Sequence, residues 1–427
     1  MGIPPLALLV GLFVFAACGG SPEERVVVTF PGSAVGAEAE VLRVQLDRFM
    51  QAHPGIRVVQ RRTPDAADQR HQLYVQWLNA GAADPDILQL DVIWTPEFAA
   101  AGWVLPLDRF TPDVEDLFPS TRDANRWRGR VYALPWFVDV GMLYWRTDLL
   151  DRPPASFEDL VRAAKRARAE GLPYGLVWQG ARYEGLVTVF LEYLTAFGGR
   201  ILDAEGRVAV DSAPAVRALE AMRAAIDEQG IVPRAALTWH EEETRFAFQN
   251  GQALFMRNWP YAYPLMQESA ESRVAGRFSV APMPAASGGT SSSALGGAQL
   301  AINARSDHPD AAYAVIAFLT QPEQMIERVR LLGQYPPRRS LYEDETLVGL
   351  LPIPPARARA IIDRAVARPV TPVYTQLSGL LQIRLHRALS GQQEPAAALA
   401  DAAQEMRGLL ARFGLAPSVA GWQNAVR

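Results

Sequence analysis

Short β-branched runs alternate with longer amphipathic segments near the start of the chain. Residues 26–30 form a run typical of a buried strand, and residues 38–50 then place apolar side chains on one face of a helix. A proline–glycine pair ends that helix, a strand resumes over 56–58, and a second helix over about 66–79 leads to a strand-like run at 87–92. This alternation predicts an α/β fold with a parallel-rich sheet and helical crossovers.

A second α/β unit follows an aromatic-rich stretch at 131–144. Pro135 stands in the middle of that stretch, which suits a crossing between two lobes better than one central strand. Ser156 and Asp159 form the capping-box pattern that opens a helix through residue 169. The other expected elements are helices over 183–197 and 213–229, a strand over 253–257 and an exposed connection, rich in Gly, Ser and Thr, over 287–293.

The N-terminus carries the pattern of a lipoprotein export signal. Residues 3–17 are apolar but too few to span a bilayer comfortably, and small residues precede Cys18, the single cysteine. We expect residues 1–17 to be a signal peptide, Cys18 to carry a lipid, and residues 18–24 to form the lipidated cysteine and its tether. The protein would then lie outside the cytoplasm, with the lipid anchor as its contact with the membrane. The alternative is a buried N-terminal helix.

Composition narrows the classes of function. With 427 residues, about half of them apolar, and a net charge of −4, the chain can bury more than one core and has no bulk attraction to nucleic acid. Its five histidines and one cysteine form no cluster at metal-ligand spacing, and there is no phosphate-binding glycine loop or Gly-x-Ser-x-Gly motif. We therefore expect no metal and no cofactor. Residues 240–243 lack the second histidine of a zinc-binding helix, which favours a solvated helix start there.

Several of the ten tryptophans stand beside polar residues. Trp94 follows Asp91, Trp136 precedes Asp139, and Trp259 follows an asparagine. A sugar ring needs aromatic faces for its C–H patches, and it needs carboxylates, amides and guanidinium groups for its hydroxyls. The pattern favours a carbohydrate site, while the alternative for each tryptophan is a place in the core.

The segments around these residues resemble the trehalose/maltose-binding proteins of ABC importers, within the broad family of extracellular sugar-binding proteins. The resemblance covers about residues 30–410. It rests on the order and spacing of Asp84-Pro85-Asp86, Leu90-Asp91-Val92, Val177-Trp178-Gln179-Gly180, Tyr183-Glu184-Gly185-Leu186, Arg257-Asn258-Trp259-Pro260-Tyr261-Ala262, Leu295-Gly296-Gly297 and Arg368-Pro369-Val370.

The resemblance implies two α/β lobes that are joined by three hinge segments and close over a ligand bound between them. The regions carried onto this chain are an N-terminal lobe of 25–135 and 285–332, a C-terminal lobe of 140–280 and 339–427, and hinges near 136–140, 281–284 and 333–338.

The resemblance also implies the residues that contact the ligand. Carboxylates, arginines, a stacking wall of Trp and Tyr, and the backbone of a glycine pair are carried over at Glu38, Arg70, Asp91, Asp139, Trp259, Tyr261, Gly296, Gly297 and Arg368. Two positions depart from the close relatives, which have Trp in place of Ala298 and Tyr in place of Phe137. We therefore expect a roomier and less polar pocket on that side, which puts strict trehalose/maltose specificity in doubt.

The implied function is that of a monomeric solute-binding protein. It would capture an α-linked disaccharide or related glycoside and deliver it to the permease subunits of an ABC importer, whose ATPase is a separate chain because no Walker motif is present here. Two other classes stay open. A glycoside hydrolase would use the carboxylates of Glu38, Asp91 and Asp139, although Arg70 and Arg368 are expected to keep them ionised. A binding protein for a non-sugar solute is the third class.

Overall fold

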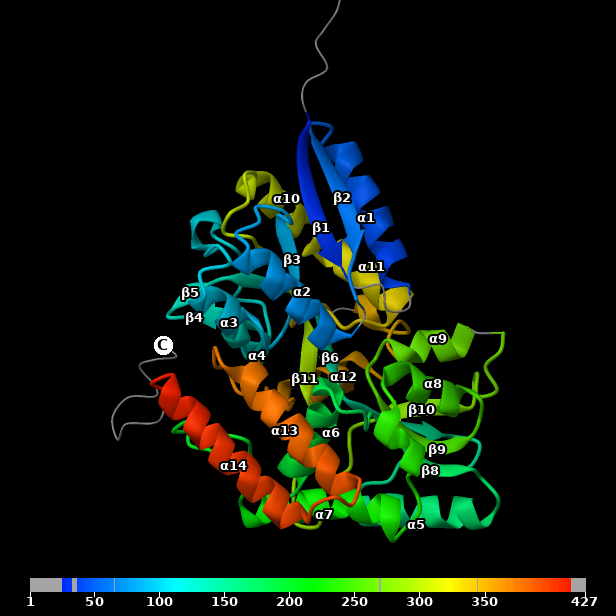
Figure 1. Cartoon of the computed structure of the whole chain (residues 1–427). Coiled ribbons are helices and arrows are strands. Elements are labelled where there is room, and N and C mark those ends of the chain that lie inside the picture. Colours follow the sequence, from blue (N-terminus) through cyan, green and yellow to red (C-terminus); the bar gives the residue numbers. More distant parts are fainter. Residues whose placement is uncertain (1–24, 33–36, 65, 269, 344, 416–427) are drawn as a thin grey trace, which may run out of the picture.

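The computed structural model describes residues 25–32, 37–64, 66–268, 270–343 and 345–415, so the expected signal peptide and Cys18 lie outside the described residues. Within them the chain forms two lobes, each with sheets flanked by helices (Figure 1). This part of the chain contains no helix long and apolar enough to cross a bilayer.

The described residues contain eleven strands, fourteen α-helices and four short 3₁₀ helices. The strands are β1 (Val26–Gly32), β2 (Ile56–Arg62), β3 (Ile87–Asp91), β4 (Arg126–Trp127), β5 (Arg130–Val131), β6 (Ala133–Val140), β7 (Met142–Arg146), β8 (Tyr174–Val177), β9 (Ala253–Asn258), β10 (Phe278–Ala281) and β11 (Leu295–Ile302). The α-helices are α1 (Glu38–Ala52), α2 (Ala67–Asn79), α3 (Thr95–Ala100), α4 (Pro119–Ala124), α5 (Phe157–Ala169), α6 (Glu184–Ala196), α7 (Ala213–Asp227), α8 (Glu241–Gln249), α9 (Ala262–Glu268), α10 (Pro309–Leu319), α11 (Pro322–Leu332), α12 (Pro355–Asp363), α13 (Tyr374–Leu389) and α14 (Pro395–Arg412). Short 3₁₀ helices are η1 (Asp108–Phe110), η2 (Arg234–Thr238), η3 (Ser340–Tyr342) and η4 (Glu345–Leu347).

The first lobe is built on β1 and β2, which are parallel, and on a three-stranded sheet in the order β3-β11-β6. Asp86 joins β1 to the start of β3, because the backbone N–H of Thr29 donates to its carboxylate at 2.8 Å. The apolar faces of α1 and α10 pack against these strands, with Phe30 and Phe49 fully buried. The strands and helices expected over residues 26–92 are thus confirmed.

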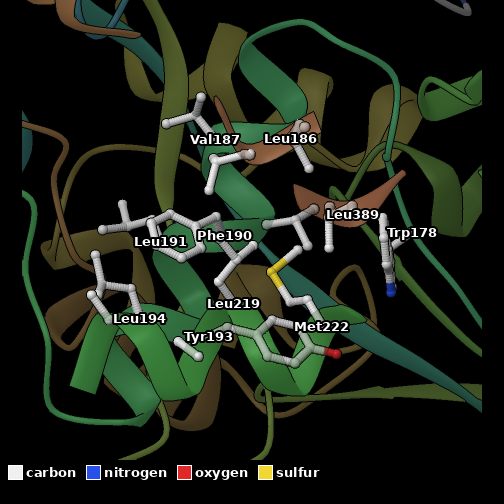
Figure 2. Packing of buried hydrophobic residues seen from close by; sticks show 14 of the residues in the cluster. Trp178, Leu186, Val187, Phe190, Leu191, Tyr193, Leu194, Leu219, Met222 and Leu389 are labelled. Carbon is white, nitrogen blue, oxygen red and sulfur yellow. The ribbon is translucent and has the colours of Figure 1, made fainter. Parts of the chain in front are cut away.

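The second lobe has a four-stranded sheet in the order β10-β7-β9-β8, covered by helices. Helix α6 is apolar on nearly all sides and lies inside the lobe, where Phe190 and Leu194 pack against Leu219 and Met222 of α7 (Figure 2). Helix α13 packs against α6 and α7, and α14 packs against α13 and α7 (Figure 1). The start of α6 is therefore held rigidly by the core behind it.

The chain passes from the first sheet to the second between β6 and β7, within the stretch predicted to cross. Strand β6 is an edge strand, which tolerates Pro135, and its pairing with β11 is irregular at Trp136. The expectation of parallel-rich sheets is wrong, since five of the seven strand pairings among the described residues are antiparallel. Strands that cross between the lobes run antiparallel to their neighbours in each sheet. The pattern of hydrophobic residues along a strand carries no information about that direction.

Two local expectations have mixed outcomes. Ser156 does cap α5, because its hydroxyl accepts from the backbone N–H of Asp159 at 3.1 Å. The connection over 287–293 is exposed only over its first four residues. Ser292 and Ser293 are buried, since the backbone N–H of Val366 donates to the carbonyl of Ser293 at 2.8 Å and ties the segment down.

Candidate functional site

A cavity of about 540 Å³ lies between the two lobes, within the usual size range of small-molecule sites. The first lobe lines it with the starts of α1 and α2 and with residues of β3, β6 and β11. The second lobe lines it with the starts of α6 and α8 and with the segment after β9. Eight of the nine predicted ligand-contacting residues line this cavity, namely Glu38, Arg70, Asp91, Asp139, Trp259, Tyr261, Gly297 and Arg368.

The ninth predicted residue, Gly296, lies directly behind the wall. A Cβ atom at this position would lie 3.2 Å from Cζ3 of Trp259 and 3.3 Å from Cβ of Asp139. Its missing side chain therefore lets the tryptophan ring lie beside Asp139. Gly297 has a φ of 118°, and a Cβ there would collide with the carbonyl of Phe137 at 2.3 Å, so this position requires glycine.

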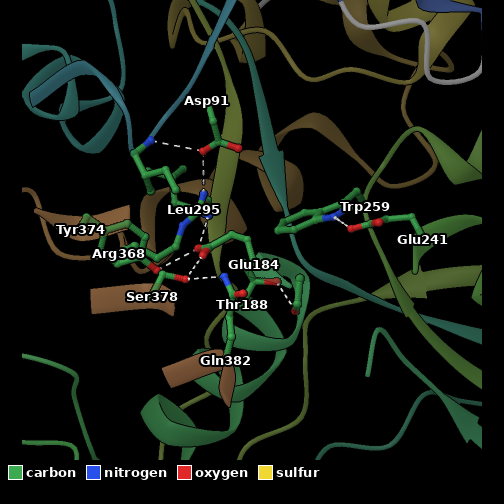
Figure 3. Close-up of polar contacts among 12 residues, drawn as sticks. Asp91, Glu184, Thr188, Glu241, Trp259, Leu295, Arg368, Tyr374, Ser378 and Gln382 are labelled. Atoms are coloured by element: carbon green, nitrogen blue, oxygen red, sulfur yellow. Dashed lines mark hydrogen bonds and ion pairs between the residues drawn. The ribbon is translucent and has the colours of Figure 1, made fainter. Parts of the chain in front are cut away.

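Arg368 joins the two lobes at one end of the cavity (Figure 3). One of its terminal nitrogens donates to Glu184 at 2.8 Å, and the other donates to Asp91 at 3.2 Å and to the carbonyl of Leu295 at 3.2 Å. Burial lowers the pKa of this arginine, but Asp91 and Glu184 outweigh that effect and raise it above its usual value. The buried guanidinium is thus matched by two carboxylates.

Glu184 is the first residue of α6, and its carboxylate is held by hydrogen bonds from other side chains of the protein. Its carboxylate accepts from Arg368, from the hydroxyl of Tyr374 at 2.8 Å and from the hydroxyl of Ser378 (Figure 3). Burial raises the pKa of Glu184, while Arg368 and the two hydroxyls oppose the rise. This residue fixes the end of the cavity and holds Arg368 in place.

Asp139 has a different environment. Burial raises its pKa to about 8, the nearby charges of Glu38 and Asp91 add to the rise, and Arg257 and Arg328 oppose it. Its Oδ1 atom is buried and has no hydrogen-bond partner among the described residues. The carboxyl group therefore presents an unused acceptor.

Trp259 forms an aromatic wall whose position is set from three sides. The guanidinium of Arg257 lies 3.9 Å from the ring centroid, and that arginine is held by two hydrogen bonds, at 2.7 and 2.9 Å, to the buried carboxylate of Glu192. The indole N–H donates to Glu241 at 3.4 Å (Figure 3). With Gly296 at its edge, the ring is fixed before any ligand arrives.

Tyr261 continues this wall and is fixed through α8. Its hydroxyl donates to Glu242 at 2.7 Å, and Arg245 donates to the same carboxylate at 3.0 Å. In the first lobe, Gln334 donates to Glu38, while Arg70 donates to the carbonyl of Pro64 at 3.0 Å.

The starts of α6 and α8 supply cavity residues that the sequence did not assign. These residues are Tyr183, Glu184, His240, Glu241, Glu242 and Glu243. Residues 240–243 do begin a solvated helix, as predicted, since His240 and Glu243 are exposed, and the same helix start also lines the cavity. The sequence does contain a signal that could have placed the start of α6 at the site. This helix follows a strand, and segments that follow strand ends gather at one edge of a sheet.

The tryptophans divide between site and core. Of the three singled out in the sequence, Trp259 lines the cavity, whereas Trp94 and Trp136 are each only 2% exposed and belong to hydrophobic cores. Phe137 and Ala298, the two departures from the family pattern, are paired across β6 and β11, and both line the cavity.

Comparison with known proteins gives the family. The sequence profile of the bacterial extracellular solute-binding proteins matches residues 34–326. The chain belongs to this family. A probable ABC transporter-binding protein of Deinococcus radiodurans is 33% identical over 95% of this chain and 98% of its own length.

Two solved structures show the same architecture. A maltose-bound MalE3 protein of T. maritima superposes with a TM-score of 0.86 and 41% identity over 90% of this chain and 100% of that one. The GacH receptor of Streptomyces glaucescens GLA.O, solved without ligand and with acarbose, superposes with a TM-score of 0.81 and 26% identity over 91% of this chain and 99% of that one. The predicted two-lobed fold is confirmed.

Membership of this family identifies a solute-binding protein and not an enzyme. The sequence argument against a hydrolase was nevertheless wrong in one respect. Arg70 and Arg368 do not keep all the carboxylates ionised, because Arg368 is used by Asp91 and Glu184 while Asp139 keeps a raised pKa. The raised pKa of Asp139 reflects a buried acceptor in a binding site.

Proposed function

We propose that this protein captures an α-linked disaccharide or a related glycoside between its lobes and delivers it to the permease of an ABC importer. The observation that carries the proposal is the chemistry of the cavity. Trp259 offers a fixed aromatic face, Asp91 and the buried, unpartnered carboxyl of Asp139 offer oxygen atoms, and Arg368 holds Asp91 in place at the end of the cavity. A sugar ring with its hydroxyls needs this combination.

The relatives support a sugar as the solute. The MalE3 structure of T. maritima contains maltose, and a maltotriose-binding protein of Pyrococcus abyssi is 24% identical over 70% of this chain and 64% of its own length. The small side chain of Ala298 favours a ligand as large as a trisaccharide or a glycoside with a bulky substituent. Trehalose and maltose are the smallest ligands to test.

Transport requires that binding favours a closed arrangement of the lobes. We propose hinges near 136–140, 281–284 and 333–338, and a ligand that contacts both lobes and so shifts the population toward the closed state. We also propose that the protein works outside the cytoplasm as a monomer and is held at the membrane by a lipid on Cys18. Replacing Cys18 with Ser should then release the protein from the detergent phase in a phase-partition assay.

Calorimetric titration of residues 19–427 tests the ligand class. We expect trehalose, maltose or a longer α-glucoside to bind with micromolar or tighter affinity, and sucrose to serve as a differently linked comparison. Trp259→Ala should weaken binding strongly, whereas Trp239→Phe, outside the cavity lining, should leave it unchanged. Stabilisation by a non-sugar solute, with no response to any sugar, would contradict the proposal.

A further inference from the structure

A glutamine in the proposed hinge segment 333–338 contacts one of the cavity carboxylates. Gln334 is 2% exposed and lines the cavity. Its Nε2 donates to Glu38, the first residue of α1. Its Oε1 accepts from two nitrogens of Arg328, at 2.9 Å from Nε and at 2.6 Å from Nη2. The amide therefore links a buried guanidinium of α11 to a carboxylate that faces the ligand.

This network fixes which end of the amide points to Glu38. Arginine has only donors, so the amide oxygen of Gln334 must face Arg328 and the amide nitrogen must face away from it. Arg328 is itself held in place, because it is 1% exposed and its guanidinium carbon lies 3.8 Å from the ring centroid of Trp136. Glu38 thus receives a donor whose direction is set within the protein, before any ligand arrives.

Satisfying Arg328 does not by itself explain an amide at position 334. Elsewhere in this protein the buried Arg257 is paired with the buried carboxylate of Glu192. Arg328 instead donates to a neutral amide, and its Nη1 atom has no hydrogen-bond partner among the described residues. A glutamate would match the charge of Arg328 better. Only the amide can accept from the arginine and also donate to Glu38.

The backbone on either side of Gln334 contacts parts of the protein that the proposed closure would move. Gly333 has a φ of 65°, and a Cβ there would lie 3.0 Å from the carbonyl oxygen of Pro260, in the aromatic wall of the second lobe. The carbonyl of Tyr335 accepts from the backbone N–H of Val138, in another proposed hinge, at 2.8 Å. A rotation at these hinges would therefore shift the amide of Gln334 relative to the cavity.

We infer that Gln334, held by Arg328, is a positioning residue that aims the carboxylate of Glu38 at the bound sugar and makes this contact depend on the conformation of the hinge. The inference rests on the proposed function. Gln334 acts through Glu38, whose carboxylate accepts from a sugar hydroxyl. Burial lowers the pKa of Arg328 to about 10, with Glu38 opposing the fall, so the guanidinium stays charged at neutral pH and keeps its donors.

Gln334→Glu tests this role because the two side chains have nearly the same shape. The new carboxylate can pair with Arg328, so the ligand-free variant should melt no lower than wild type. It cannot donate to Glu38 and places a second negative charge against it. Calorimetric titration at pH 8 with the most tightly bound α-glucoside should therefore show an affinity at least about tenfold lower. Gln404→Glu, the same change at an exposed position of α14, should bind like wild type.

Combining this change with Glu38→Gln separates positioning from direct contact with the ligand. In the double variant the new amide at position 38 can donate to the new carboxylate at position 334, so the hydrogen bond is restored in the opposite direction. Adding Gln334→Glu to Glu38→Gln should therefore lower the affinity by less than about twofold. An equal, tenfold loss in both backgrounds would overturn the inference, because Gln334 would then act without Glu38.

The remaining outcomes separate this inference from the proposed function. Wild-type affinity in Gln334→Glu would overturn the inference and leave the sugar-binding function standing, because Gln334 would then serve only Arg328. A Gln334→Glu variant that melts well below wild type would contradict the predicted pairing with Arg328 and overturn the inference as well. If the wild-type protein binds no sugar, the proposed function fails and this inference fails with it.

Discussion

Replacing Asp139 with Asn should stabilise the empty protein while weakening ligand binding. The carboxyl has a pKa of about 8 in the folded protein and an ordinary value of 3.8. Below pH 3.8 the group is protonated in both states and costs nothing. Between 3.8 and 8 the unfolded chain ionises and the folded protein does not, so stability falls as the pH rises. The sign follows from the raised folded pKa.

The size of the effect follows from the same values. At pH 7 the difference of about three pH units corresponds to roughly 4 kcal/mol, and at pH 5 it corresponds to roughly 1–2 kcal/mol, at about 1.4 kcal/mol per unit. Asparagine cannot ionise, so Asp139→Asn should unfold at higher urea concentration than wild type. The gain should grow from pH 5 to pH 8 and then level off.

Urea unfolding followed by tryptophan fluorescence at pH 5, 6, 7 and 8, without ligand, measures this difference. The control is Asp363→Asn at the end of α12, an exposed aspartate with only a 3.8 Å contact to Arg359, which should change stability by less than about 0.5 kcal/mol at every pH. A difference between wild type and Asp139→Asn that does not change with pH would refute the reasoning.

Asp139→Asn should also bind the ligand more weakly than the wild-type protein. A ligand hydroxyl that donates to Asp139 favours the ionised form, so binding to the wild-type protein near pH 7 should release part of a proton. Asp139→Asn should lose that release and about 1.5–3 kcal/mol of binding free energy. Titrations in buffers of different ionisation enthalpy detect the released proton, and identical heats in all buffers would contradict this role.

Substitutions at four further positions probe separate parts of the protein. Trp259→Ala should weaken sugar binding by about 2 kcal/mol, or roughly 30-fold, in a calorimetric titration, because it removes the stacking face. Arg368→Ala should lower the free energy of unfolding, measured in urea, by about 3–5 kcal/mol, because it leaves Glu184 buried without its cation. Arg368→Lys should restore only part of this loss, since lysine lacks the forked guanidinium that reaches three acceptors. Thr375→Val should weaken binding about fivefold without touching the cavity, because it removes the 2.7 Å hydrogen bond from Thr375 in the second lobe to Glu97 in the first. Ala298→Trp should fill the cavity and reduce binding of maltotriose more than binding of maltose, as competition titrations would show.

Much of the fold followed from the sequence because its signals are local. The strand at 26–30 and the helix at 38–50 showed the periods of buried strands and amphipathic helices, and both are present as β1 and α1. The direction of β6 and β7 did not follow, since antiparallel entry depends on how the chain returns between the lobes. The bounds of a helix can be read from its own residues, but the pairing of distant strands cannot.

The site residues likewise divide into those that could be predicted from the sequence and those that could not. Asp91, Asp139 and Trp259 were placed by resemblance to a family, and all three line the cavity. Local composition could not separate Trp259 from Trp136, because both stand beside polar residues and only the tertiary packing buries one of them. Glu241 was missed because acidic residues at a helix start usually serve the helix, and the sequence does not show that this start faces the other lobe.

The most direct test of the central claim is a crystal structure of the protein with the sugar that binds most tightly in calorimetry. Our account predicts a sugar in the cavity between the lobes, with one ring on the face of Trp259, hydroxyl groups on Asp91 and Asp139, and contacts from both lobes. A sugar bound to one lobe only, outside this cavity, would contradict it.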